Sequence, residues 1–117
     1  MRRLKLFVVV AFALIVVTAC FDSKPERYVI ADSKEYEASL FRQHCAICHG
    51  SEADGKTLAD GTIVPSLRTG EFKMKTSADI RRQISDGGNG MTPFRRMLTD
   101  REIKLLTDFV QHDLRGQ

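Results

Sequence analysis

The feature that most constrains this chain is the stretch Cys45-Ala46-Ile47-Cys48-His49, in which a histidine follows two cysteines three positions apart. With this spacing, each thiol can add across one vinyl group of the same haem, and His49 lies where its imidazole can bind the iron. The chain holds three Cys and three His among 117 residues, so a shuffled sequence would carry the pattern roughly once in a thousand times. The stretch therefore predicts one covalently attached haem, held by Cys45 and Cys48.

Three other interpretations of the two cysteines are open. A zinc site needs four ligands, usually in two separated pairs, and the neighbouring His44 and His49 lie too close in sequence to the single cysteine pair for a comfortable tetrahedron. A redox-active dithiol of the thioredoxin kind needs a βαβ context, and no strand pattern surrounds the motif. A structural disulfide is the simplest alternative. The C-x-x-C-H spacing favours haem over all three.

The first 19 residues have the pattern of an export signal. Basic residues precede an uncharged run from Leu6 to Val17, which is shorter than the ~20 residues that a membrane-spanning helix needs. The stretch Val17-Thr18-Ala19-Cys20 resembles the lipobox of bacterial lipoproteins, which implies that cleavage leaves Cys20 as a lipid-modified first residue. An ordinary signal peptide, with Cys20 as a spare thiol, is the alternative. We therefore expect an exported protein, held by lipid to a membrane of the bacterial cell envelope, with its domain in the periplasm or on the outer surface.

Length and charge limit what the mature chain can be. Removal of residues 1–19 leaves 98 residues, enough for one small domain. The signal carries three of the 18 basic residues and none of the 15 acidic ones, so the mature chain has 15 of each and gives no indication of nucleic-acid binding. We expect residues 20–31, which lack any period, to be a lipid-anchored tether, and residues 32–117 to form the haem domain.

Three helices joined by loops are expected in this domain. The first is predicted from a capping box at residues 32–35 to residue 44, the second over residues 77–86, and the third from a capping box at residues 99–102 to about residue 113. Residues 50–70 are rich in Gly, Ser, Thr and Asp and predict a long loop. No strand alternation is present, so the predicted fold class is all-α.

A second iron ligand is expected just after the flexible segment Gly87-Gly88-Asn89-Gly90. Something must fix such a loop, and Met91 follows it directly. Met74 and Met97 are expected to be packing or surface residues, and a gap-filling core position is the alternative for Met91 itself. Because His and Met are the ordinary axial pair of cytochromes c, a haem at the motif favours Met91 as the second ligand.

In their order, these residues resemble the class I cytochrome c family, in particular the small bacterial modules related to the third subunit of cbb3 oxidases. The resemblance implies a class I cytochrome c fold, with three main helices and long loops around one haem c. It also implies that the carbonyl of Pro65 accepts a hydrogen bond from the haem histidine, and that Phe41 and Phe109 pack where the first and last helices cross. The family commonly has Gly where this chain has Glu37, so we expect a shifted or looser crossing. The resemblance covers about residues 35–111, and its anchors are Phe41, Cys45-x-x-Cys48-His49-Gly50, Pro65-Ser66-Leu67, Gly90-Met91-x-Pro93 and residues 102–110.

The function expected from these features is one-electron transfer in a bacterial respiratory or photosynthetic chain, without enzymatic activity. With His49 and Met91 both on the iron, no position is open for oxygen or a substrate. Residues 68–104 hold nine basic against five acidic side chains, which predicts docking of an acidic redox partner such as an oxidase, a reductase or a cytochrome complex. The alternative is a solvated surface that binds no partner. The residues expected to dock are Lys73, Lys75, Arg95 and Arg96.

Two further functions are open at this point. In the first, the protein is a haem sensor or is peroxidase-like, and Met91 dissociates so that iron can bind a gas or peroxide. In the second, it is a haem-free lipoprotein with a redox-active dithiol.

Overall fold

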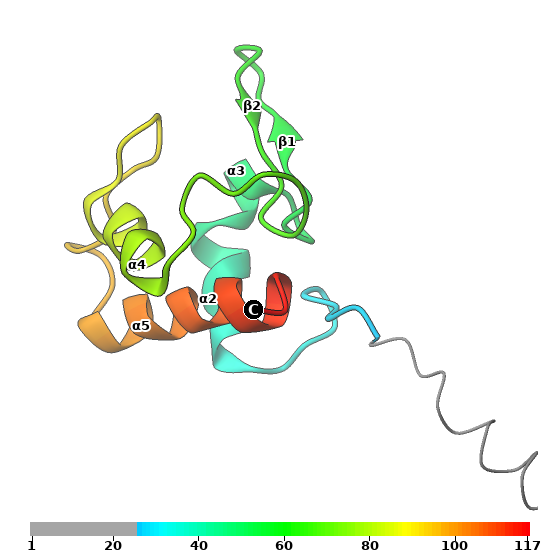
Figure 1. Ribbon diagram of the computed structural model, residues 1–117, viewed down its shortest axis with the longest axis vertical. Helices are drawn as coiled ribbons and strands as arrows, with labels where there is room; N and C mark the ends of the chain where they lie inside the picture. Colours follow the sequence, from blue (N-terminus) through cyan, green and yellow to red (C-terminus); the bar gives the residue numbers. More distant parts are fainter. Residues whose placement is uncertain (1–25) are drawn as a thin grey trace, which may run out of the picture.

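The computed structural model describes residues 26–117; residues 1–25, which include the predicted signal peptide and Cys20, lie outside the described part. The described chain is mainly helical, with two short strands (Figure 1), in agreement with the predicted helical fold. No helix in this part is both long enough and apolar enough to cross a membrane. The elements in chain order are α2 (Tyr36–His44), α3 (Ala46–His49), β1 (Lys56–Thr57), β2 (Ile63–Val64), α4 (Ser77–Asp86), α5 (Asp100–Asp108) and the π-helical η1 (Phe109–Leu114).

The start of α2 differs from the prediction. Its N-cap is Glu35, which makes no side-chain capping bond, so the capping box predicted at residues 32–35 is wrong. Ser33 Oγ instead accepts the backbone N–H of Glu35 and lies 2.6 Å from the hydroxyl oxygen of Tyr28. Because this serine is bonded to the preceding segment, α2 begins only at Tyr36. Its end at His44 agrees with the prediction.

Both later helices begin where the sequence predicts, and each begins with a capping box, which the sequence predicted only for the second of them. In each box the threonine hydroxyl accepts a backbone N–H three residues on, and the carboxylate at that position accepts the backbone N–H of the threonine. α4 ends at Gly87, as predicted, with a φ of 69°. After α5 the chain continues through η1 to Leu114, close to the predicted end of the last helix. The two capping pairs are Thr76 with Asp79 and Thr99 with Glu102.

A small antiparallel hairpin interrupts the long loop after the motif. Lys56 lies opposite Val64 and Thr57 opposite Ile63, and the hairpin projects away from the helices (Figure 1). The sequence predicts no strand here, because strands of two residues are too short to show alternation. Lys56 Nζ donates a hydrogen bond of 3.1 Å to the carbonyl of Ile47, so the hairpin is tied to the cysteine motif.

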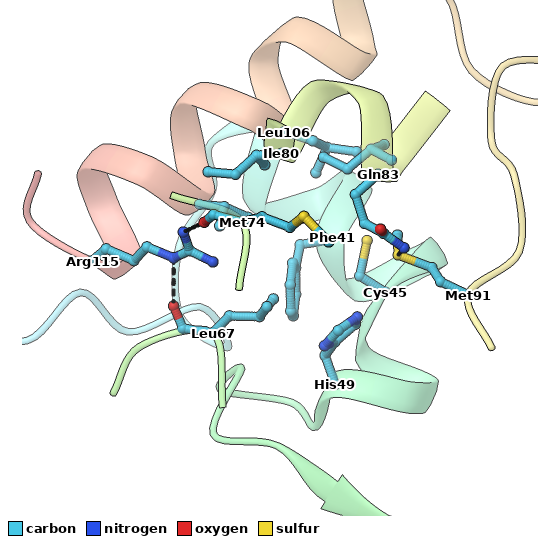
Figure 2. A pocket seen from close by; sticks show the side chains of 12 residues that line it. Phe41, Cys45, His49, Leu67, Met74, Ile80, Gln83, Met91, Leu106 and Arg115 are labelled. Carbon is cyan, nitrogen blue, oxygen red and sulfur yellow. Dashed lines mark hydrogen bonds between the residues drawn. The ribbon is translucent and has the colours of Figure 1, made fainter. Parts of the chain in front are cut away.

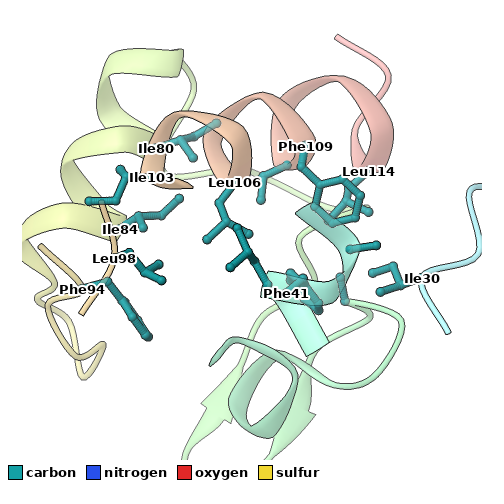
Figure 3. Close-up of a cluster of buried hydrophobic side chains, with 14 residues drawn as sticks. Ile30, Phe41, Ile80, Ile84, Phe94, Leu98, Ile103, Leu106, Phe109 and Leu114 are labelled. Carbon is teal, nitrogen blue, oxygen red and sulfur yellow. The ribbon is translucent and has the colours of Figure 1, made fainter. Parts of the chain in front are cut away.

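The core lies where α2 and α4 pack against α5, and it extends into η1 (Figure 3). The ring centroids of Phe41 and Phe109 are 6.0 Å apart and both side chains are almost fully buried, which confirms the predicted aromatic contact between the first and last helices. Ala38 is fully buried in the same cluster, whereas Glu37 is only partly buried. The small residue at the helix crossing is therefore Ala38, one position after the place where the family commonly has Gly.

The segment just before α2 lies against the body of the domain. Ile30 is fully buried in the core. The Glu52 carboxylate accepts the backbone N–H groups of Ile30 and of the next residue, at 3.0 and 2.9 Å. The guanidinium of Arg68 pairs with Glu52 at 3.3 Å and also donates to the carbonyl of Tyr28. The loop after the motif thus fastens this N-terminal segment to the domain.

Candidate haem-binding site

The motif occupies the end of α2 and the single turn of α3. The backbone N–H of Cys45 donates to the carbonyl four residues earlier and so closes α2, and α3 then carries Cys48 and His49. α3 ends at His49. The next residue, Gly50, has a φ of 82°, and a Cβ there would lie 3.0 Å from the carbonyl oxygen of Gly55. Glycine at position 50 therefore lets the following loop turn back beside the motif.

A cavity opens beside the motif, between α2, α4 and the last helix (Figure 2). It holds about 530 Å³ of space free of protein atoms, including the part open to solvent. Ligand pockets are usually lined mainly by apolar side chains, and this cavity is lined in the same way. Its lining residues are Phe41, Cys45, His49, Leu67, Met74, Ile80, Gln83, Ile84, Met91, Leu106, Val110 and Arg115.

Three of the predicted haem-binding residues line this one cavity, although they come from different segments. Cys45 follows directly after α2, His49 ends α3, and Met91 follows the glycine-rich segment after α4. Cys48 and Pro65 are both exposed and do not line the cavity. The structure thus brings one attachment cysteine and both predicted axial ligands together.

The partly buried ring of His49 has one buried nitrogen without a partner. Its Nδ1 makes no hydrogen bond within residues 26–117, so the predicted bond to the Pro65 carbonyl is not formed in this structure. Such a buried polar atom typically costs about 1–3 kcal/mol, which a bound group or a movement of the ring could offset. Burial also lowers the pKa of His49, which favours the neutral imidazole. The neutral form is the one that binds metals.

The two motif cysteines are free thiols, so the structure contains no disulfide between them. Burial, with a smaller contribution from the charge of Cys48, raises the pKa of Cys45 to about 12. A redox-active dithiol needs a lowered thiol pKa, and the surroundings of Cys45 have the opposite effect. Within residues 26–117, no group of three or more His, Cys, Asp and Glu side chains is placed to hold a metal ion. The surroundings therefore disfavour the dithiol, and the described residues give no support to the zinc interpretation.

Met91 is held at the cavity by α4 and by its own loop. Gly88 and Met91 exchange backbone hydrogen bonds of 2.9 and 3.0 Å. On α4, Gln83 Nε2 donates to the Gly88 carbonyl at 2.8 Å and to Met91 Sδ at 3.7 Å (Figure 2). A Cβ at Gly87 would lie 2.5 Å from the Met91 carbonyl oxygen, so only glycine lets the loop pass α4 this closely. These contacts fix the position of the thioether.

Sequence reasoning assigned no cavity role to Met74, Gln83 or Arg115. Met74 packs partly buried against the core, within the range of the prediction, but it also brings a second thioether to the cavity. Gln83 stands three residues after Ile80 on the same face of α4, and this spacing is the only sequence signal that places it at the cavity. Arg115 lies beyond the predicted end of the last helix, where no periodic pattern indicates its direction.

A comparison with known families accounts for this arrangement. The sequence model of the family described as cytochrome c oxidase, cbb3-type, subunit III matches residues 36–110, a range that includes the motif, Pro65 and Met91. The chain belongs to this family. It is therefore a c-type cytochrome domain, which implies haem-based electron transfer, and such domains are typically electron carriers rather than enzymes.

This cytochrome domain was also compared with solved structures and with curated proteins. Among solved structures, the KustC0563 c-type cytochrome matches with 28% sequence identity and a TM-score of 0.48, over 62% of this chain and 90% of that one. No curated protein matches the chain.

The cavity itself fits the covalent haem c of a c-type cytochrome. A partly buried thiol, and an imidazole whose pKa is lowered by burial, lie at the edge of a mainly apolar space, as a macrocycle held by thioether bonds and a histidine requires. The unpartnered Nδ1 of His49 indicates that the site is completed by an additional group or contact.

Proposed function

We propose that this cytochrome domain is a one-electron carrier of a bacterial respiratory or photosynthetic chain, with one haem c ligated by His49 and Met91 and with a lipid tether at Cys20. One observation carries the proposal: Cys45, His49 and Met91, from three separate segments, line a single, mainly apolar cavity. A haem bound there would supply reversible one-electron chemistry.

Each of the predicted haem-binding residues has a role in this proposal. Cys45 and Cys48 hold the group through thioether bonds, with Cys48 at the exposed surface. His49 donates a neutral imidazole nitrogen to the iron, and its unpartnered Nδ1 donates to the carbonyl of Pro65 once the ring and loop have adjusted. Met91 supplies a thioether sulfur, which raises the reduction potential relative to a second histidine. With both axial positions taken, the chain leaves no place for a substrate on the iron.

We further propose that a set of exposed basic side chains receives the redox partner. Lys73, Lys75, Arg95 and Arg96 are all exposed, and Arg95 forms a surface ion pair with Asp86 at 3.2 Å. Family membership suggests redox proteins as partners, and an acidic docking surface on an oxidase, reductase or cytochrome complex would complement these charges. Reversal of the four charges should flatten the salt dependence of electron transfer. An unchanged salt dependence would rule out docking at these side chains.

The membrane tether is proposed from the sequence of the first 20 residues. Lipid on Cys20 would hold the exported domain at a membrane of the bacterial envelope, in the periplasm or on the outer surface. Because the Glu52 carboxylate fastens the chain at Ile30, only a short segment would separate the lipid from the domain. Cys20→Ala should move the protein from the membrane fraction to the soluble fraction while its haem content is unchanged. Retention in the membrane fraction would contradict lipid anchoring.

Covalent haem attachment tests the core of the proposal. The full chain, produced in a host that exports it and matures c-type cytochromes, should keep its haem after denaturation and acid extraction, and mass spectrometry should show one haem per chain. Cys45→Ser and Cys48→Ser should each leave a single thioether, which shifts the reduced absorption maximum to the red. A chain that loses all haem on extraction, or never acquires it, would contradict the proposed function.

A further inference from the structure

One fixed charge faces the otherwise mainly apolar cavity. Arg115 is partly buried, and among the described lining residues it alone carries a permanent charge. Within residues 26–117, no carboxylate forms an ion pair with it. Loss of hydration lowers the pKa of Arg115, because burial disfavours the charged form. A cation drawn out of water needs a counter-charge, and the described chain supplies none at this point.

The guanidinium is held in a defined orientation. Its Nε donates to the Leu67 carbonyl at 3.2 Å and its Nη1 to the Met74 carbonyl at 2.7 Å, while Cζ lies 3.9 Å from the ring centroid of Phe72. Both acceptors are neutral backbone groups, so the positive charge is oriented but not compensated. Within the described residues Nη2 makes no hydrogen bond, and its N–H groups can serve an acceptor that enters the cavity.

The position of Arg115 indicates which part of a bound haem it meets. Figure 2 shows Arg115 on the opposite side of the cavity from Cys45, His49 and Met91. The vinyl groups that form thioethers lie along one edge of the haem macrocycle, and its propionate carboxylates extend from the other edge. A haem held by the motif cysteines would therefore have its carboxylates away from the motif, on the side that Arg115 occupies.

We propose that Arg115 binds a haem propionate and that its charge raises the reduction potential of the bound haem. This inference rests on the proposed haem site. A planar guanidinium recognises a carboxylate through paired N–H bonds, which a lysine ammonium does not reproduce. Oxidation adds a positive charge to the iron, and a fixed cation nearby disfavours that state. Arg115 thus both positions the haem and adjusts its potential.

Three variants of the full-length holoprotein test this assignment. Arg115→Gln removes the charge, Arg115→Lys keeps the charge but changes the donor geometry, and Arg101→Gln removes an exposed charge on α5 that does not line the cavity. The readouts are the midpoint potential and the propionate-bending band in resonance Raman spectra. We expect Arg115→Gln to lower the potential and shift the band. Arg115→Lys should shift the band while its potential stays near the wild-type value, and Arg101→Gln should change neither.

The outcomes separate this inference from the proposed function. A wild-type protein without covalent haem, or without a His/Met spectrum, would contradict the proposed function itself. If the wild-type protein has both, but the propionate band is unchanged in the Arg115 variants, the propionate contact is wrong. Should Arg115→Gln fail to accumulate as folded holoprotein, Arg115→Lys decides the question alone, because a changed band supports the contact and an unchanged band overturns it.

Discussion

Gln83 Nε2 donates to Met91 Sδ across 3.7 Å, and the same nitrogen holds the Gly88 carbonyl at 2.8 Å. One side chain on α4 thus fixes both a sulfur atom and the loop that carries it. The glycine-rich segment has little conformational preference of its own, and Gln83 is the described side chain that connects it to a helix. Met91 is therefore held at the cavity by a contact with α4.

The first prediction concerns this contact. Gln83→Leu keeps most of the side-chain volume but removes the donor, and a net hydrogen bond contributes about 0.5–1.5 kcal/mol. We expect the weak absorbance of Met-ligated ferric haem at the red end of the spectrum to disappear at a lower temperature than in the wild-type holoprotein. Gln43→Leu, on the exposed face of α2, is the matched control and should leave the transition unchanged. Identical transitions in all three proteins would show that Gln83 does not hold Met91.

The second prediction concerns the glycine at the end of α4. A Cβ at Gly87 would lie 2.5 Å from the Met91 carbonyl oxygen and 2.7 Å from Pro93 N, so Gly87→Ala must displace the loop. Gly90→Ala is the control, because Gly90 also has a positive φ but nothing lies within 4 Å of its added Cβ. Backbone strain alone costs roughly 1–2 kcal/mol. Denaturant unfolding should therefore show that Gly87→Ala lowers the free energy of unfolding more than Gly90→Ala does. Equal decreases would contradict the close approach of the loop to α4.

The third prediction concerns the aromatic contact between the first and last helices. Phe109 is almost fully buried against Phe41, and Phe109→Ala should lower the free energy of unfolding by about 3–5 kcal/mol, measured by denaturant titration. Met97→Ala is the control, because Met97 is 56% exposed and its loss should cost less than about 0.5 kcal/mol. A loss below 1 kcal/mol for Phe109→Ala would place this ring outside the cooperative core.

The fourth prediction concerns acid stability. The Tyr36 hydroxyl, and then the backbone and side chain of Thr99, donate to Glu102 and lower its pKa to about 2. Because the unfolded-state pKa is about 4.3, this stabilisation is fully present above that pH and is lost as the pH falls toward 2. Unfolding titrations from pH 7 to pH 2 should show that the wild-type protein has a higher free energy of unfolding than Glu102→Gln near pH 7. This difference should shrink as the pH falls from about 4.3 toward 2. A difference that is independent of pH would contradict the carboxylate's role.

The sequence allowed prediction of the parts of the fold that follow local rules. Thr76 and Thr99 form capping boxes within four residues of chain, and the apolar period of the last helix places Phe109 in the core. The sequence around Ser33 also fits the capping-box pattern. In the structure, however, the Ser33 hydroxyl forms a hydrogen bond with the hydroxyl of Tyr28, which the pattern does not predict. The β hairpin was missed because each of its strands has two residues.

At the candidate site, prediction was possible where residue type alone limits the chemistry. Few side chains can bind haem iron or haem vinyl groups, so Cys45, His49 and Met91 could be selected without coordinates, and the structure brings them to one cavity. The proposed roles of Gln83 and Arg115 depend on where their side chains point. That orientation is set by how α4 and η1 pack. A glutamine on a helix and an arginine near a chain end have many ordinary uses, so neither residue could be distinguished from a surface side chain.

The most direct measurement for the proposed His/Met site is the ferric spectrum of Met91→Ala compared with Met74→Ala. Both thioethers line the same cavity, so Met74 controls for the loss of a cavity methionine. We predict that the weak absorbance at the red end, present in the wild-type holoprotein, is lost in Met91→Ala and kept in Met74→Ala. Retention of that band in Met91→Ala, or its loss only in Met74→Ala, would contradict the assignment of Met91 as the axial ligand.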